Sequence, residues 1–411
     1  MPLTLRQNFS WTFLGNVIYA ACQWAMLIVL AKLGTPEMVG QFTLGLAIAA
    51  PVIMFTNLNL RAAQATDAID RYRFSDYFGL RLISSAIALL LLFAITVAAG
   101  YGRETAGVIL IVGFAKGVEA VSDIVYGLIQ KHERMDRIAV SMMIKGALSV
   151  LFLASGVHLT GSVIGGVIGL AIAWIIVLIS YDLRSALMLL KHRSHPTWKV
   201  QILRSLVWLC LPLGFAMMLI SLNANIPRYF IEHYLSEREL GIFAAIAYLM
   251  TAGTTIVNAL GESASPRLSK YYAMQDFRAF WRLLLKLIAI ALFLGLTAVL
   301  IAIVAGKQVL TLLYQPEYAQ YSDLFVWLMI ASTISYVASF LGYGMTAARY
   351  FSVQVPLLMT TTGVSAWVCV GFVPRWGLFG AAIALISAAS IQAILSLGIV
   401  IHAIKQLRSA V

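Results

Sequence analysis

Long apolar runs alternate with short polar connections from one end of the chain to the other. An α-helix needs about 20 predominantly apolar residues to cross a bilayer, and each run approaches or exceeds that length. The longest connection covers residues 182–204, which leaves no room for a soluble catalytic domain. The pattern predicts twelve membrane-spanning helices, at residues 9–33, 38–60, 79–100, 106–129, 139–158, 162–181, 205–233, 240–261, 283–306, 323–346, 353–373 and 377–402.

The composition agrees with this pattern. Of the 411 residues, 61% are hydrophobic and 11% are charged, whereas soluble domains have about 25% charged residues. We therefore predict an all-α polytopic membrane protein. The net charge of +12 does not indicate a nucleic-acid partner, because the basic residues lie in short loops between apolar runs. Most of them fall on the side that holds both termini, which predicts cytoplasmic termini by the positive-inside rule.

The connection at 182–204 divides the predicted helices into two sets of six. Gly40-Gln41-Phe42 opens the second helix as Gly241-Ile242-Phe243 opens the eighth. Six helices per half give both halves the same orientation, so a pseudo-two-fold axis along the membrane normal should relate them. We predict an N-terminal lobe at residues 1–190, a cytoplasmic inter-lobe loop at 191–204 and a C-terminal lobe at 205–411.

A stripe of polar residues lies on the fourth predicted helix. Lys116, Glu119, Asp123 and Gln130 fall within roughly 60° of one another at helical spacing. Each charge at a bilayer centre costs about 2.5–3.5 kcal/mol, so these side chains should face protein or water rather than lipid. The stripe therefore predicts one wall of a polar pathway through the helices.

Pairing of these charges leaves two interpretations open. Lys116 and Glu119 can pair at spacing i,i+3, and Lys145 on the next helix lies about as deep as Asp123, which predicts an Asp123–Lys145 pair. In one interpretation the pairs only lock helices together. In the other they act in transport: Lys116 and Lys145 attract an anionic head group, or Glu119 or Asp123 exchanges a proton or sodium ion.

A gate is predicted at the cytoplasmic ends of the second and eighth helices. The spacing that aligns their openings also places Asn258 opposite Asn57 and Glu262 opposite Arg61. Opposite charges at matching positions can meet across the pseudo-axis and close the cytoplasmic mouth. The alternative is that these are ordinary interfacial charges at helix ends.

The seventh predicted helix contains Pro212 and Pro227, which predict an interruption and a bend. Near the second proline we expect Asn223, Asn225 and Arg228 to line the cavity. Arg228 can equally extend to the outer head groups.

Motifs for other chemistry are missing. The sequence has no GxxxxGK[ST] phosphate-binding loop and no HExxH motif, and its three cysteines are far apart. We expect no enzymatic activity, no metal and no cofactor, other than a proton or sodium ion for coupling.

Three segments resemble a known family: LAKLGTPEMVGQFTLGLAIA (30–49), LLYQPEYAQYSDLFVWL (312–328) and VPRWGLFGAAIALIS (373–387). They are similar to segments of bacterial flippases for O-antigen and exopolysaccharide repeat units. These flippases share a superfamily with multidrug and toxin extrusion transporters and the peptidoglycan-precursor flippase. The resemblance implies two six-helix lobes around a central cavity in the bacterial cytoplasmic membrane, working by alternating access.

The resemblance also implies the substrate, an oligosaccharide linked to undecaprenyl diphosphate, and contact with membrane lipids and polysaccharide polymerase machinery. A diphosphate needs cationic groups, which Lys116 and Lys145 supply. One rival is a cation-coupled multidrug exporter, although cationic drugs would favour a cavity dominated by carboxylates. The other is a membrane-bound glycan polymerase or ligase, which would need a catalytic constellation that the short external loops lack.

Overall fold

The computed structural model describes residues 4–67, 71–190, 196–350 and 353–409, and these residues form no β-strand. Two irregular segments interrupt the α-helices, the π-helical turn η1 (Leu178–Asp182) and the 3₁₀ segment η2 (Pro316–Tyr321). The α-helices are α1 (Leu5–Leu33), α2 (Pro36–Thr56), α3 (Leu60–Thr66), α4 (Phe74–Ala99), α5 (Arg103–Lys131), α6 (Met135–Thr160), α7 (Val163–Val177), α8 (Leu183–Leu189), α9 (Val200–Tyr234), α10 (Glu237–Tyr248), α11 (Met250–Ala273), α12 (Phe277–Leu313), α13 (Ser322–Ala347), α14 (Gln354–Trp376) and α15 (Leu378–Ser409).

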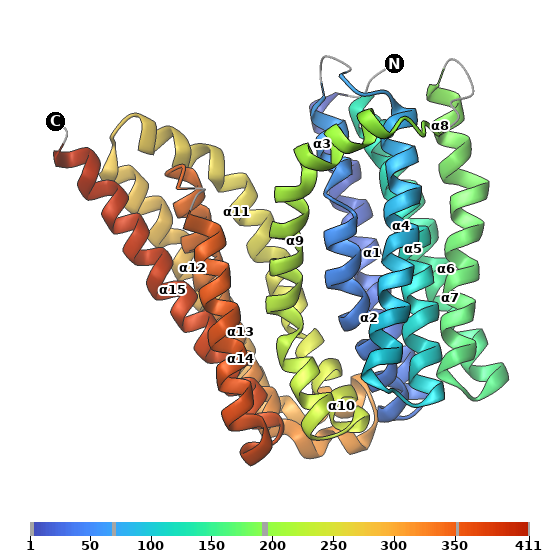
Figure 1. Cartoon of the computed structure of the whole chain (residues 1–411). Helices are drawn as coiled ribbons and strands as arrows, with labels where there is room; N and C mark the ends of the chain where they lie inside the picture. The colour runs from blue at the N-terminus through green and yellow to red at the C-terminus, as the bar shows by residue number, and fades with distance from the viewer. Residues whose placement is uncertain (1–3, 68–70, 191–195, 351–352, 410–411) are drawn as a thin grey trace. The chain divides into compact units, whose positions relative to one another are not determined.

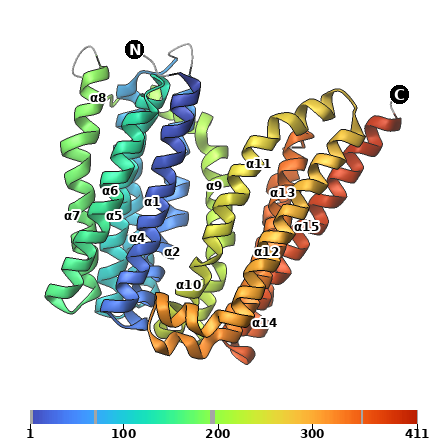
Figure 2. The same ribbon diagram turned by 180° about the vertical axis from the view of Figure 1, so that it is seen from behind.

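The chain forms two compact units, residues 1–221 and 222–411. The first contains α1 to α8 and the first part of α9 (Figure 1). The second contains the rest of α9 and α10 to α15, which Figure 2 shows from behind. Within the second unit, α12, α13 and α15 pack around a core that includes Phe280, Leu284, Phe340 and Val400.

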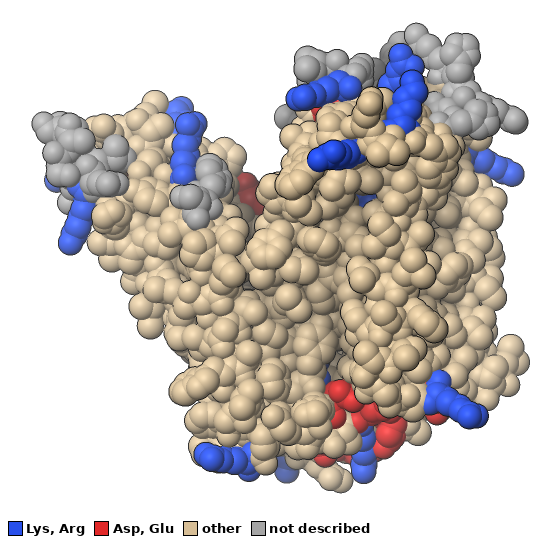
Figure 3. All heavy atoms as spheres, in the orientation of Figure 1, with Lys and Arg blue, Asp and Glu red and all other residues tan. Residues whose placement is uncertain are grey.

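Eleven helical segments of the described chain are long and apolar enough to cross a membrane. The remaining predicted span is α5, a 29-residue helix that carries Lys116, Glu119 and Asp123. On the face that Figure 3 shows, charged side chains gather toward the top and the bottom, and the broad surface between them is mostly uncharged. The prediction of an all-α polytopic membrane protein is confirmed, and these helices of the described chain match eleven of the twelve predicted spans.

Helix α5 is the centre of the first unit. It packs against α2, α3, α4, α6, α7 and α8. Its last turns, from Ile124 to Ile129, are buried throughout. Because other helices surround α5, a polar stripe on it lies inside the unit rather than against lipid.

Helix α9 differs from the prediction. It runs unbroken for 35 residues through Pro212 and Pro227, so the predicted interruption is wrong. A proline removes one backbone hydrogen bond, and a transmembrane helix can tolerate this when its surroundings satisfy the freed carbonyl.

The beginning of α9 is attached to the first unit. Leu206 and Cys210 are buried in a cluster with Leu58 and Tyr77. Ahead of the helix, the Thr197 amide donates to the carbonyl of Ser75, at 3.0 Å. The sequence-based lobe division at 191–204 therefore differs from the observed grouping, in which α9 belongs to the first unit as far as Ser221.

Candidate functional site

The first unit contains a cavity of about 470 Å³. Its walls come from α1, α2, α3, α5, α6 and α9 and from the turn between α2 and α3, and they include six of the residues predicted from the sequence. The lining residues are Tyr19, Ala50, Ile53, Met54, Asn57, Asn59, Arg61, Lys116, Glu119, Ala120, Asp123, Tyr126, Met142, Lys145 and Met217.

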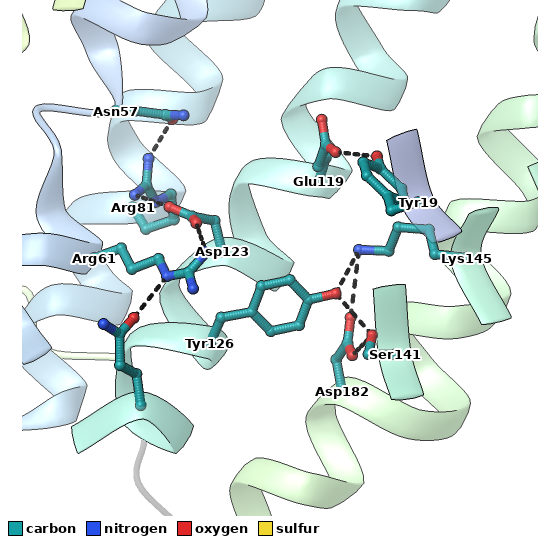
Figure 4. Close-up of polar contacts among 11 residues, drawn as sticks. Tyr19, Asn57, Arg61, Arg81, Glu119, Asp123, Tyr126, Ser141, Lys145 and Asp182 are labelled. Atoms are coloured by element: carbon teal, nitrogen blue, oxygen red, sulfur yellow. Dashed lines mark hydrogen bonds and ion pairs between the residues drawn. The ribbon is translucent and has the colours of Figure 1, made fainter. Parts of the chain in front are cut away.

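The α5 stripe forms the charged wall of this cavity, as its periodicity predicts. Lys116, Glu119, Asp123 and Tyr126 follow one another at spacings of three or four residues, so they share one face of the helix. Lys116 and Glu119 belong to one polar group, and Asp123 and Tyr126 to one each; Figure 4 shows the contacts of Glu119, Asp123 and Tyr126 with neighbouring helices. Three such groups surround the cavity.

The first group is centred on Asp123, which two arginines hold. Arg61 Nη1 lies 3.3 Å from Asp123 Oδ1, and Arg81 Nη2 lies 3.5 Å from Oδ2. Arg81 is fully buried and also donates to Asn57 Oδ1, while Arg61 Nε donates to Gln130 Oε1 at 3.1 Å. One carboxylate therefore joins α3, α4 and α5.

A backbone break between α2 and α3 positions Asn57 and Arg61. Leu58 and Asn59 have φ angles of 52° and 49°. Asparagine tolerates this left-handed conformation, but for leucine it is strained. Leu58 is only 6% exposed and packs in the cluster with Tyr77 and Cys210, which holds the strained turn in place. The turn ends α2 and lets α3 present Arg61 to Asp123.

The second group contains Lys145, and here the predicted Asp123–Lys145 pair is wrong. Lys145 Nζ lies 3.6 Å from Asp182 Oδ2 and donates to the hydroxyl of Tyr126 at 3.1 Å. Asp182 was missed because it follows the apolar run of the sixth span, where a loop was expected. The π-helical turn η1 and α8 continue the helix past that point and bury Asp182 completely.

The third group confirms the predicted pair on α5. Lys116 Nζ lies 2.8 Å from Glu119 Oε2, and Tyr19 on α1 donates to Glu119 Oε1 at 2.7 Å. Lys116 Nζ also lies 5.1 Å from the ring centroid of the buried Trp174, a cation–π arrangement. Tyr19 reaches the site because α1 approaches α6 closely at Gly146.

Together, the three groups have a small excess of positive charge. Four cations oppose three carboxylates: Arg61, Arg81, Lys116 and Lys145 against Glu119, Asp123 and Asp182. Arg81 is the cation that sequence reasoning missed. It lies near the predicted start of the third span at residue 79, but α4 begins at Phe74, so Arg81 is about two turns inside the helix.

The predicted C-terminal cavity residues lie in the second unit, on the last part of α9. Arg228 Nη1 donates to Asn225 Oδ1 at 2.9 Å, and Asn225 is 6% exposed. Asn223 lies two residues before Asn225 on the same helix. They are not among the residues that line the cavity of the first unit. Their assignment to a substrate cavity stays a prediction.

The predicted gate also stays a prediction. Asn258 and Glu262 are exposed on α11, which is continuous from Met250 to Ala273. At the matching positions of the first half, α2 has ended and the chain turns at Leu58 and Asn59. The sequence match between Arg61 and Glu262 therefore does not extend to the local backbone.

Among the described residues, no group of three or more His, Cys, Asp or Glu side chains is arranged to hold a metal ion. The lining of the cavity offers hydroxyl, amide, ammonium, guanidinium and carboxylate groups. Such groups bind anions and exchange protons.

Comparisons with known proteins bear on this arrangement. A family model described as "Polysaccharide biosynthesis protein" matches residues 5–272. The "Capsular polysaccharide biosynthesis protein CapF" of Staphylococcus aureus is 27% identical over 382 residues, which cover 92% of this chain and 95% of that protein.

Two solved structures are similar over most of the chain. One is the inward-facing conformation of a multidrug resistance MATE family transporter of the MOP superfamily, with a TM-score of 0.71, 13% identity and coverage of 97% of this chain and 99% of the other. The other is "Lipid II flippase MurJ, inward closed conformation", with a TM-score of 0.72, 13% identity and coverage of 94% and 86%. At these identities the likeness shows that the chain has the two-lobe fold of this superfamily.

Proposed function

Because the chain belongs to the polysaccharide biosynthesis protein family, we propose that it is a flippase for oligosaccharide repeat units linked to undecaprenyl diphosphate. The chain is a multi-pass membrane protein with a transporter fold. We place it in the bacterial cytoplasmic membrane with both termini inside. The matched S. aureus relative is described as a capsular polysaccharide biosynthesis protein, and the similar MurJ structure as a lipid II flippase.

The observation that carries the proposal is the cationic surplus of the cavity in the first unit. Arg61, Lys116 and Lys145 line the cavity, and the buried Arg81 forms an ion pair with Asp123. A diphosphate carries several negative charges, and charge-assisted hydrogen bonds to arginine and lysine are strongest where water is limited. Asp123 occupies the position between Arg61 and Arg81 that a phosphate oxygen would take.

The rest of the lining suits the other parts of such a head group. Asn57 and Asn59 offer amides to sugar hydroxyls, and Tyr19 and Tyr126 offer aromatic faces. The polyprenyl tail needs no place in the cavity, because it can stay in the bilayer while the head group crosses. The cavity volume of about 470 Å³ is therefore to be compared with the head group alone.

The transport cycle we propose is alternating access between inward and outward openings, coupled to a proton or sodium ion. It contains no chemical step, and the polysaccharide polymerase machinery would use the product. The static alternative, in which the ion pairs only lock helices, predicts the same contacts but no dependence of export on charge. Variants that keep the fold but lose one of these charges should therefore lose export if the charges act in transport, and keep it if the pairs are only locks.

A cation-coupled multidrug exporter is the second candidate. Its support is the likeness to the MATE family transporter and the presence of Glu119 and Asp123 in the lining. Both carboxylates are already paired with cations, at 2.8 Å for Glu119 and at 3.3 Å and 3.5 Å for Asp123. Either kind of substrate would have to displace a partner from these pairs, but four cations face three carboxylates, so the net positive charge favours the anionic substrate.

A leaflet-exposure assay tests the proposal. The protein is reconstituted in liposomes that contain a fluorescent oligosaccharide linked to polyprenyl diphosphate, and exposure of the head group is read with a membrane-impermeant quencher or glycosidase. We expect head groups to change leaflet in the presence of the protein and not in empty liposomes, under at least one of a proton or a sodium gradient. Export of cationic dyes without movement of the head group, under either gradient, would favour the multidrug exporter instead.

A further inference from the structure

Asp182 is the most deeply buried carboxylate among the described residues of the first unit, and neither the sequence motifs nor the proposed substrate site accounts for it. It lies at the end of the π-helical turn η1 and is fully buried. Its Oδ1 accepts a hydrogen bond from Ser141 Oγ at 2.5 Å. Its Oδ2 has Lys145 Nζ at 3.6 Å and accepts no hydrogen bond from the described residues, so Oδ1 is the oxygen to which a neighbouring hydroxyl can pass a proton.

A chain of hydrogen bonds joins Asp182 to the cavity wall (Figure 4). Tyr126 lines the cavity, and its hydroxyl lies 2.7 Å from Ser141 Oγ. Because Ser141 gives its only proton to Asp182, Tyr126 must donate to Ser141. Lys145 Nζ, which also lines the cavity, donates to the Tyr126 hydroxyl at 3.1 Å.

All three donors therefore point the same way. The chain of hydrogen bonds begins at the cavity, where Lys145 donates to Tyr126. Tyr126 donates to Ser141, and Ser141 donates to the buried carboxylate of Asp182. Hydroxyl chains with one donor direction transfer a proton without moving any heavy atom far. We propose that Asp182 is a proton-binding site that the cavity loads through Tyr126 and Ser141.

The transfer balances as follows. Lys145 gives a proton to the Tyr126 oxygen as Tyr126 passes its own to Ser141 and Ser141 passes its own to Asp182. Both hydroxyls end as hydroxyls, Asp182 becomes a neutral acid and Lys145 a neutral amine. A hydronium ion from the solvent that reaches the cavity then reprotonates Lys145 and leaves a water molecule, so one proton is taken up in total.

Protonation of Asp182 changes the electrostatic environment of the groups around it. The titratable groups that face it are Lys145 from α6, Tyr126 from α5 and the adjacent Tyr181. A buried ion with no partner costs several kcal/mol, so the Lys145 ammonium stays beside Asp182 while that carboxylate is charged. Loading neutralises Asp182, and the Lys145 ammonium becomes free to engage an anion in the cavity. The proton site stands on its own contacts, whereas this link to the head group rests on the proposed function.

Infrared difference spectroscopy tests the proton site directly. Spectra of the protein in lipid nanodiscs, recorded in mildly acidic and mildly alkaline buffer, should show a carboxylic-acid carbonyl band that Asp182→Asn removes. Glu119→Gln, which alters a carboxylate in the cavity lining, is the matched control and should keep that band. After a pH jump, Tyr126→Phe and Ser141→Ala should delay its appearance by about a hundredfold, the scale at which a positioned proton donor contributes.

Persistence of the full band in Asp182→Asn would overturn the proposal. If that variant does not fold, Asp182→Glu replaces it in the experiment. A carbonyl band at the wild-type frequency in Asp182→Glu would also overturn the proposal. Binding of a polyprenyl diphosphate, measured by calorimetry in two buffers of different ionisation enthalpy, then separates the two ideas. Uptake of one proton by the wild type and none by Asp182→Asn supports both. A band specific to Asp182 without any binding of the diphosphate keeps the proton site and removes the proposed function.

Discussion

Arg61 Nη1 lies 3.3 Å from Asp123 Oδ1, so a residue just beyond the break in the second span holds a carboxylate of the fourth. The same carboxylate receives Arg81 on its other oxygen. The strained turn at Leu58 and Asn59 makes this contact, because an unbroken α2 would carry Arg61 elsewhere. The cavity thus contains its own anion between two arginines, and a substrate phosphate has to compete with it.

Asp123→Asn should destabilise the protein by about 1–3 kcal/mol. The change removes the partner of Arg81, which is fully buried and would keep only Asn57. Thermal unfolding followed by tryptophan fluorescence in detergent micelles measures the loss. Arg61→Gln is the comparison, because both side chains of that pair are 30% exposed and such pairs contribute less than about 1 kcal/mol. An equal or larger loss in Arg61→Gln would contradict the assignment of Arg81 as the buried partner.

Lys145→Met should cost about 3–5 kcal/mol, since Asp182 is left as a buried charge without a cation. The double variant Lys145→Met/Asp182→Leu should recover most of that stability, because apolar side chains can replace a buried ion pair at little cost. Export of the lipid-linked oligosaccharide should stay lost in the double variant. This pair of measurements decides between the two interpretations of the charges: recovery of both stability and export would make the pair a static lock.

Lys116→Gln should reduce export strongly and stability little. Lys116 and Glu119 have side-chain exposures of 25% and 27%, and a pair of this kind is worth less than about 1 kcal/mol. Lys116→Arg keeps the charge and should retain part of the export rate. Both variants are compared in the leaflet-exposure assay at equal amounts of inserted protein, and an unchanged rate for Lys116→Gln would remove Lys116 from the cationic wall.

The sequence carried enough information for the spans and for the polar face of α5, because both follow from the spacing of apolar and charged residues along one helix. The Lys116–Glu119 pair was predictable for the same reason. Partners on different helices were not. The contact of Arg61 with Asp123 depends on two residues with positive φ, and that of Lys145 with Asp182 depends on a π-helical turn. Neither the positive φ angles nor the π-helical turn leaves a periodic pattern in the sequence. The prolines of α9 predicted an interruption that the helix does not have.

The break between α2 and α3 can be tested from the opposite helix. A methyl group on Gly127 of α5 would lie 2.5 Å from the side-chain amide of Gln64 and 3.3 Å from the Cα atom of Arg61, both on α3. Gln64 is only 2% exposed, so it has little space to move away. Gly127→Ala should therefore displace α3 and weaken the Arg61–Asp123 contact.

Gly117→Ala provides the matched control on the same helix, because its methyl group would meet nothing nearer than Leu89 Cδ2 at 4.0 Å. Both substitutions remove a glycine from a helix interior, which by itself stabilises by about 1 kcal/mol. Gly117→Ala should show that gain and normal export, whereas Gly127→Ala should show a smaller gain or a loss, together with reduced export. Thermal unfolding and the leaflet-exposure assay measure the two effects. Export of Gly127→Ala at the rate of Gly117→Ala would mean that the position of Arg61 relative to Asp123 does not matter for transport.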